Sequence, residues 1–125
     1  MTGIVLDTGA LIAFERNDRA VVAVIARAVE HGVPIAIPAG VVGQAWRDGR
    51  RQVRLVRLLA SHPVTVEPLD DARSRAAGQL CGVTRTADVI DASVVLCART
   101  LGRVVMTSDV DDLRRLDATL RLVAV

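Results

Sequence analysis

Short apolar runs alternate with amphipathic stretches along the whole chain. Ile4-Val-Leu6 is apolar throughout, which is typical of an inner strand, and comparable runs follow later. We predict strands at residues 4–6, 33–37, 64–67, 103–107 and 120–125. Apolar positions three and four residues apart predict helices at residues 10–16, 20–30, 38–46, 50–60, 71–81, 87–100 and 110–116.

Polar and glycine residues mark where these helices begin and end. Asn17 or Asp18 can cap the helix that starts at residue 20, and we expect Gly82 and Gly102 to end the two long helices. Strands that alternate with helices favour an α/β fold. We therefore expect a single domain over residues 1–125, with three layers and a mostly parallel central sheet of about five strands flanked by helices.

The composition is that of a globular protein with a sizeable core. Hydrophobic residues make up 51% of the chain. Cys81 and Cys97 stand alone in the sequence, so we expect buried, reduced thiols. No apolar run reaches the length of a membrane span, and the first residues lack the basic stretch of a signal peptide. We expect a cytoplasmic protein.

The basic residues exclude several function classes. All sixteen are Arg, and the net charge is +2. The absence of Lys excludes a Walker A loop, a response-regulator receiver and a haloacid-dehalogenase phosphatase. The last of these also requires a second Asp where the chain has Gly9.

The acidic residues point to metal chemistry. The chain has eleven Asp and three Glu. Asp7 ends the first predicted strand, and Asp109 follows the fourth. Asp88 and Asp91 lie at the start of the long helix that precedes the fourth strand, and their spacing of three places them on one helical face. Clustered carboxylates repel one another and need a cation. Oxygen ligands without His or Cys favour Mg²⁺ or Mn²⁺.

Three motifs in this order resemble the PIN-domain ribonucleases, and most closely their VapC toxin branch. They are residues 4–13 (IVLDTGALIA), residues 88–95 (DVIDASVV) and residues 105–109 (VMTSD). The resemblance implies a Mg²⁺-dependent endoribonuclease that uses metal-activated water and leaves a 5′-phosphate. It also implies a toxin–antitoxin system, a homodimer and a cognate VapB-type antitoxin.

The same resemblance assigns roles to individual residues. It implies a catalytic and metal-binding set of Asp7, Asp91 and Asp109, with Asp88 as an additional acidic residue and with Thr8 and Thr107 in support. The family usually places a Glu on the helix after the second strand, where this chain has Gln44. We expect Asp48 or Asp88 to compensate for the missing charge.

Two sets of arginines are candidates for RNA contact. One is a predicted helical stripe opposite Val53, Val56 and Leu59, and the other lies near Asp109. The sets are Arg47, Arg50, Arg51, Arg54 and Arg57, and Arg114 and Arg115. The alternative reading is a degenerate PIN domain that binds RNA or an antitoxin with weak or no catalysis, because Gln44 replaces the Glu. A DNA substrate is a further alternative.

Overall fold

The computed structural model describes residues 3–125. Residues 1–2 belong to the N-terminal stretch in which the sequence predicts no signal peptide, and they lie outside the described residues. The strands are β1 (Ile4–Leu6), β2 (Ile35–Pro38), β3 (Val64–Glu67), β4 (Val104–Thr107) and β5 (Leu122–Ala124). The helices are α1 (Thr8–Glu15), α2 (Arg19–Glu30), α3 (Ala39–Ala45), α4 (Val53–Leu59), α5 (Asp71–Thr84), α6 (Val89–Leu101) and α7 (Val110–Leu116).

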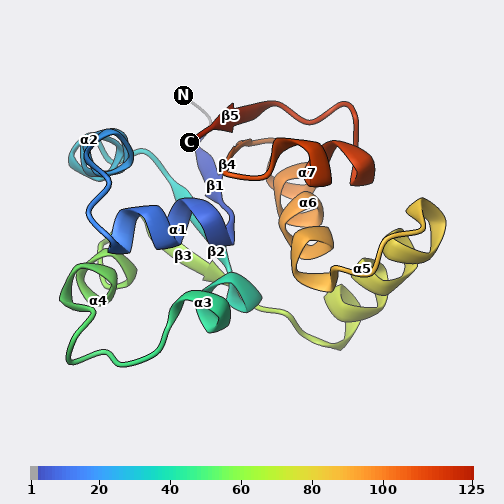
Figure 1. Cartoon of the computed structure of the whole chain (residues 1–125), viewed down its shortest axis with the longest axis horizontal. Helices are drawn as coiled ribbons and strands as arrows, with labels where there is room; N and C mark the ends of the chain where they lie inside the picture. Colours follow the sequence, from blue (N-terminus) through green and yellow to red (C-terminus); the bar gives the residue numbers. More distant parts are fainter. Residues whose placement is uncertain (1–2) are drawn as a thin grey trace.

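The strands form one sheet in the order β3-β2-β1-β4-β5, and every pair is parallel (Figure 1). β1 lies in the centre, with Val5 paired to Ala36 on one side and to Val105 on the other. The predicted α/β fold with a mostly parallel sheet of about five strands is confirmed. The carboxyl ends of all five strands meet at one edge, where open parallel sheets bind their ligands.

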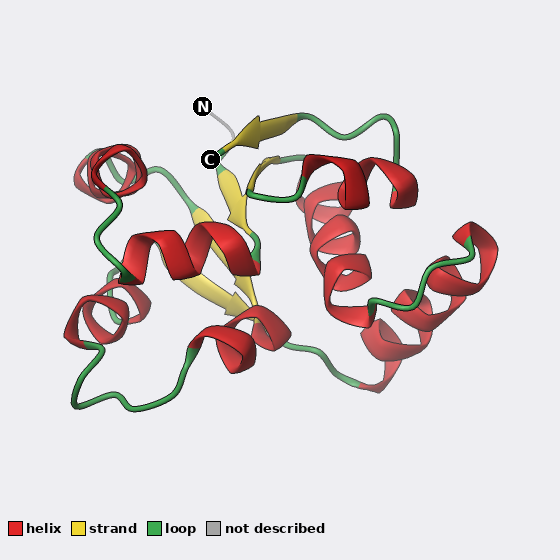
Figure 2. Cartoon of the chain, in the orientation of Figure 1, coloured by secondary structure: helices red, strands yellow, loops and turns green. Residues whose placement is uncertain are grey.

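Helices cover both faces of the sheet, which forms the middle layer in Figure 2. α1, α2 and α4 lie on one side, and α5 and α6 lie on the other (Figure 1). α6 packs against β1 and β2 and contributes the buried residues Val94 and Val95. Val5 and Leu6 of β1 are fully buried, because a central parallel strand is covered on both faces.

The prediction that Gly82 ends a helix is wrong. α5 continues to Thr84, and Arg85 ends it in the left-handed conformation (φ 57°, ψ 43°). The N–H of Arg85 still donates to the carbonyl of Cys81. Gly82 has no positive φ, so the helix passes through it, and a Cβ there would meet no atom within 4 Å.

The predicted helix over residues 50–60 is also too long at its start. The Gln52 side chain accepts hydrogen bonds from the N–H groups of Arg47 (2.7 Å) and Asp48 (3.0 Å), and it donates to the carbonyl of Ala45 (2.9 Å). These bonds hold residues 46–52 as a loop, and α4 begins at Val53. Its buried residues are Leu55 and Leu58, whereas Val53 and Val56 are exposed, so the expected apolar face was wrong.

Both cysteines are free and buried, as predicted. Burial raises the pKa of the Cys97 thiol to about 11, which keeps it protonated at neutral pH. Within residues 3–125, no helix has the length and apolar character that crossing a membrane requires.

Candidate metal centre

Asp7 lies at the carboxyl end of β1 and caps the N-terminus of α1. Asp7 is buried, and its Oδ1 accepts a hydrogen bond of 2.8 Å from the N–H of Ala10. Burial raises the pKa of Asp7, while hydrogen bonds from the Thr107 side chain and from nearby backbone N–H groups partly offset this rise. The fold therefore holds this carboxylate in one position at the centre of the sheet edge.

The pairing of β1 with β4 brings a second acidic segment to the same edge. Leu6 lies opposite Met106, and the N–H of Asp7 donates to the carbonyl of Met106 at 3.2 Å. Thr107 is fully buried at the end of β4, and its Oγ1 accepts a hydrogen bond of 2.8 Å from the N–H of Asp109. Thr107 thus contacts both acidic segments, in the place where the sequence predicts a supporting hydroxyl.

α1 and the loop after β4 approach each other closely at Gly9. A Cβ on Gly9 would lie 1.6 Å from Oγ and 2.6 Å from Cβ of Ser108. Gly9 follows Asp7 and Ser108 precedes Asp109, so this contact sets how near the two acidic segments come. Only a glycine fits at position 9.

Three carboxylates form a compact group at this edge, which we call the acidic group. Its members are Asp91, Asp109 and Asp112, whose potential ligand oxygens all lie within 4.8 Å of one another. Asp91 lies in the first turn of α6, Asp109 precedes α7, and Asp112 lies in the first turn of α7. α6 and α7 pack side by side, and this packing assembles the group (Figure 1).

Asp112 is the member of the acidic group that the sequence motifs did not indicate. Its side chain is 48% exposed, yet it lies three residues after Asp109, within one turn. That spacing is the signal that would have found it. Asp7 is outside the close group, but its negative charge raises the pKa values of Asp91 and Asp109, so it is an electrostatic neighbour of both.

The carboxylates of the acidic group repel one another. Burial, followed by the charges of Asp88, Asp109, Asp7 and Asp112, raises the pKa of Asp91 to about 7. A hydrogen bond with the Asp112 side chain is the main cause of the raised pKa of Asp109, with smaller contributions from burial and from the Asp112 charge. Like charges at this separation favour protonation unless a cation lies between them. Carboxylate oxygens without His or Cys suit a hard divalent cation such as Mg²⁺ or Mn²⁺, so these residues fit such an ion.

Asp88 lies beside the acidic group and caps α6. Its Oδ1 accepts a hydrogen bond of 2.9 Å from the N–H of Asp91. Asp88 is the N-cap of α6, three residues before Asp91, and both side chains line the same cavity. Asp88 acts on Asp91 through its charge and through the cap.

Gln44, on α3, reaches the site through Thr8. The Thr8 hydroxyl donates a hydrogen bond to Oε1 of Gln44, which places the amide beside the residue that follows Asp7. Asp48 does not compensate for the missing Glu in this structure. It lies in the loop after α3 and pairs with Arg50 at 3.5 Å and with Arg51 at 3.9 Å.

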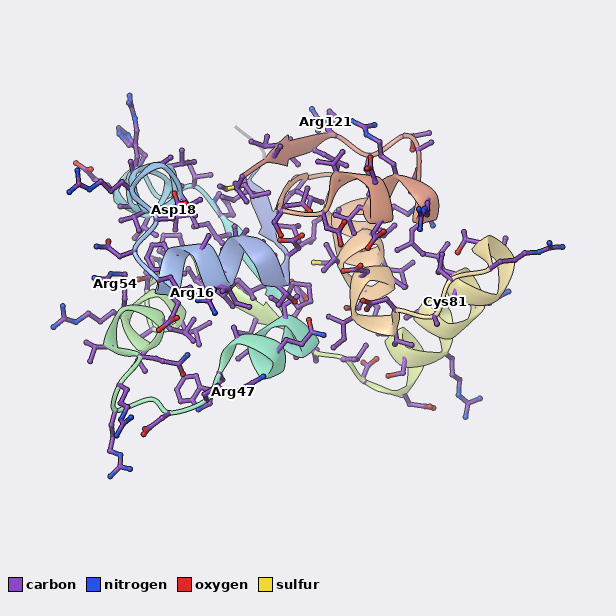
Figure 3. All side chains as sticks on the ribbon, viewed as in Figure 1. Arg16, Asp18, Arg47, Arg54, Cys81 and Arg121 are labelled. Atoms are coloured by element: carbon purple, nitrogen blue, oxygen red, sulfur yellow. The ribbon has the colours of Figure 1, made fainter. Side chains whose placement is uncertain are left out.

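The first arginine set does not form a continuous helical stripe. Arg47, Arg50 and Arg51 lie in the 46–52 loop, and Arg54 lies on α4. Arg54 donates to the carbonyl of Glu15 at 3.2 Å, and Arg47 donates to the carbonyls of Trp46 and Gly43. Figure 3 shows Arg47 and Arg54 on the side of the molecule formed by α3 and α4, away from α7. Their contact with RNA stays a prediction.

Comparison with known proteins identifies the family. The family model described as PIN domain matches residues 4–118, which is nearly the whole chain. No curated protein matches the sequence. The matched range contains both strand ends and both helices that supply the acidic residues. This chain belongs to the PIN-domain family.

Proposed function

We propose that this protein is a metal-dependent endoribonuclease that hydrolyses RNA phosphodiesters. The observation that carries the proposal is the acidic group, three carboxylates with ligand oxygens within 4.8 Å of one another beside the buried Asp7. The PIN family is a family of nuclease type. A site with this surplus of negative charge has no evident structural use, and it suits a divalent cation that in turn attracts a phosphodiester.

Asp91 and Asp109 would hold the cation, with Asp112 in the same group and the buried Asp7 as an electrostatic neighbour. When bound, Mg²⁺ or Mn²⁺ lowers the pKa of water and neutralises charge on the phosphodiester. Asp7 is fixed by its bond to the N–H of Ala10, and the Asp109 backbone is fixed by Thr107. Because Gln44 accepts from Thr8 through Oε1, its amide N–H groups remain free to donate to substrate.

A cleavage assay with matched variants tests this proposal. Wild type, Asp109→Asn and Asp111→Asn are incubated with bulk transfer RNA and with fluorescein-labelled hairpin RNAs, in Mg²⁺ or in EDTA. Asp111 is an exposed carboxylate on α7 outside the acidic group, so Asp111→Asn controls for the loss of one charge. We expect Asp109→Asn to slow cleavage at least a hundredfold, or about 2.7 kcal/mol, and Asp111→Asn to cleave normally. Equal rates for both variants would contradict the proposal.

The alternative is a degenerate PIN domain that binds without cleaving, and Gln44 is the observation that favours it. An amide at this position supplies no charge to the site. Under this alternative wild type does not cleave any of the RNAs, and Gln44→Glu gains Mg²⁺-dependent cleavage that Asp109→Asn removes. Single-stranded and duplex DNA in parallel reactions separate a ribonuclease from a deoxyribonuclease.

We further infer that the protein is a VapC-type toxin that pairs with a VapB-type antitoxin and forms a homodimer. This inference is supported by the motif resemblance alone. Its test is induced expression in a bacterial host, which is expected to stop growth unless the product of an adjacent upstream reading frame is co-expressed. Growth arrest that persists with Asp109→Asn would contradict a toxin that acts by cleavage. Light scattering of the purified protein measures the oligomeric state.

A further inference from the structure

A cavity adjoins the acidic group and has no assigned role. Its volume is about 240 Å³, and it opens between the α5–α6 connection and α7. Asp91 and Asp112 form one wall, so the cavity and the acidic group share two carboxylates. Arg85, Thr86 and Arg115 line the rest, together with Asp88 and two apolar residues. We call this cavity the Arg85–Arg115 pocket.

Arg85 occupies a backbone position that normally favours glycine. It has φ 57° and ψ 43° at the end of α5, where the left-handed conformation costs a side chain about 1–2 kcal/mol. Among residues 3–125, no carboxylate pairs with Arg85. The chain thus carries a strained residue with an unpaired cation at the rim of the pocket. A left-handed residue commonly ends a helix, but it is usually glycine, so a long cationic side chain is unusual at this position.

Arg115 supplies a second guanidinium to the same cavity, from the last turn of α7. Its Nη1 lies 3.6 Å from a carboxylate oxygen of Asp112, and its side chain is 72% exposed. Its neighbour Arg114 is on the same helix but does not line the pocket. The sequence makes Arg114 and Arg115 equal candidates for RNA contact, whereas in the structure only Arg115 lines the pocket.

The pocket combines two arginines with Asp91 and Asp112, two carboxylates of the acidic group. An anion in it could meet the cation on one side and the guanidinium groups on the other. Guanidinium forks match the paired oxygens of a phosphate. A phosphodiester chain that reaches the acidic group carries its next phosphate one nucleotide away. A carboxylate ligand would also pair with the guanidinium groups, but it would not be covalently linked to the phosphodiester that is cleaved.

We propose that the Arg85–Arg115 pocket binds the RNA phosphate next to the one that is cleaved. This inference rests on the proposed ribonuclease function. Arg85 and Arg115 are then binding residues that set the register of the RNA on the acidic group. The strained backbone at Arg85 places a long cationic side chain where a glycine would satisfy the fold.

Binding measurements test this role separately from cleavage. The probe is the fluorescein-labelled hairpin RNA that wild type cleaves fastest, titrated in Ca²⁺ by fluorescence anisotropy, with intact RNA verified on a gel. Arg85→Gln and Arg115→Gln are compared with Arg75→Gln. Arg75 lies on α5 about 15 Å from Arg85 along the helix, and it pairs with Asp71 at 3.0 Å on the surface. We expect each pocket variant to weaken binding about tenfold and to reduce the salt dependence by about one phosphate contact. Arg75→Gln should bind like wild type.

Replacement of single phosphates locates the contact on the RNA. Methylphosphonate linkages, which are neutral, are placed one at a time on either side of the cleavage position. Wild type should lose affinity when the linkage adjacent to that position is neutral, and Arg85→Gln should be indifferent to the same change. If Arg85→Gln and wild type respond equally at every linkage, the proposal is wrong.

Arg85→Gly separates a binding role from a structural one. Glycine removes the left-handed strain, so the melting temperature should rise while RNA binding weakens as in Arg85→Gln. Unchanged binding in a more stable Arg85→Gly would overturn the proposal. Inorganic phosphate that binds in an Arg85-dependent manner, with no effect of Arg85→Gln on RNA, would identify free phosphate as the occupant and also overturn it.

The outcomes distinguish this inference from the proposed function. Wild-type cleavage of RNA together with normal binding by both pocket variants overturns the inference alone. No binding and no cleavage of RNA by wild type overturns both, because the pocket then has no RNA phosphate to hold.

Discussion

Asp91 is half-buried, lies in the first turn of α6 and belongs to the acidic group. Its pKa is raised to about 7 by burial and by four neighbouring carboxylates, Asp88 first among them. The sequence indicates Asp91 because apolar residues follow it directly. The size of the rise in the pKa of Asp91 depends on residues up to 84 positions away in the chain, such as Asp7.

The raised pKa of Asp91 predicts a pH-dependent stability in the absence of metal. The unfolded chain releases this proton near its ordinary pKa of 3.8, and the folded chain keeps it until about pH 7. The folded state binds more protons across that window, so stability falls as the pH rises from about 4 to 7. In EDTA we expect Asp91→Asn to melt above wild type at pH 8, and to do so by a clearly smaller margin at pH 5.

The comparison is made by thermal unfolding at both pH values, with Asp111→Asn as the matched control. Asp111→Asn removes an exposed carboxylate from the first turn of α7, so its effect should be small at both pH values. The same increase in melting temperature for Asp91→Asn at pH 5 and pH 8 would show that ionisation of Asp91 is not the cause.

Gly9 is a second residue whose identity the tertiary contact explains. We expect Gly9→Ala to cost about 1–3 kcal/mol, because its Cβ would lie 1.6 Å from Oγ of Ser108 and the two segments would have to separate. Adding Ser108→Gly removes both colliding atoms and should restore much of the stability. Chemical unfolding measures these changes. Gly78→Ala on α5 is the control, since a Cβ there meets no atom within 4 Å and should stabilise by about 0.5–1 kcal/mol. Equal effects of Gly9→Ala and Gly78→Ala would refute this account.

At the scale of single elements, capping residues are the most informative part of the sequence. Asp18, Asp70 and Asp88 each accept a backbone hydrogen bond at the start of a helix. The predicted bounds of α7, residues 110–116, agree with the structure. Errors arise where a side chain outside the local pattern competes, as Gln52 does in the loop before α4.

Substitutions at Asp88 can separate its role as the N-cap of α6 from the effect of its negative charge. Asp88→Ala removes the bond to the N–H of Asp91 and should cost about 1 kcal/mol of stability. Asp88→Asn keeps an accepting oxygen, so it should be nearly as stable as wild type while lowering the pKa of Asp91 through the lost charge. Chemical unfolding and the pH dependence of stability measure the two effects. If Asp88→Asn also weakens Mg²⁺ binding strongly in calorimetry, Asp88 is a ligand as well as a cap.

At the scale of the whole molecule, strand order brings the acidic residues together. β1 and β4 are adjacent in the sheet although Leu6 and its pairing partner Met106 lie 100 positions apart in the chain. α6 then packs on the sheet beside α7. The acidic group is therefore made of segments that meet only in the folded state, so a cation bound there should stabilise the fold.

We accordingly expect Mg²⁺ to raise the melting temperature of wild type. At a concentration about 100 times its dissociation constant, the stabilisation is about 2.7 kcal/mol. The effect should be larger at pH 8 than at pH 5, because a proton on Asp91, whose pKa is raised to about 7, competes with the ion. Asp109→Asn should lose most of it. Matched ionic strength in NaCl controls for screening, and an equal rise in NaCl would exclude specific binding.

The sequence by itself determined the elements and the acidic positions at their ends. Apolar runs and caps act over a few residues, so the five strands, the α/β class and the family could be inferred from local pattern and motifs. Asp7, Asp91 and Asp109 were found because strand ends and helix starts are local features. Their roles remain proposals.

Only the tertiary structure decided what these positions have around them. The place of Asp112 in the acidic group, the bond between Thr8 and Gln44, the fit of Gly9 against Ser108 and the difference between Arg114 and Arg115 all depend on how distant elements pack. The physical reason is range. Hydrogen bonding and periodicity along the chain set the elements, whereas distances, burial and raised pKa values arise between segments whose separation is set by strand order and helix packing.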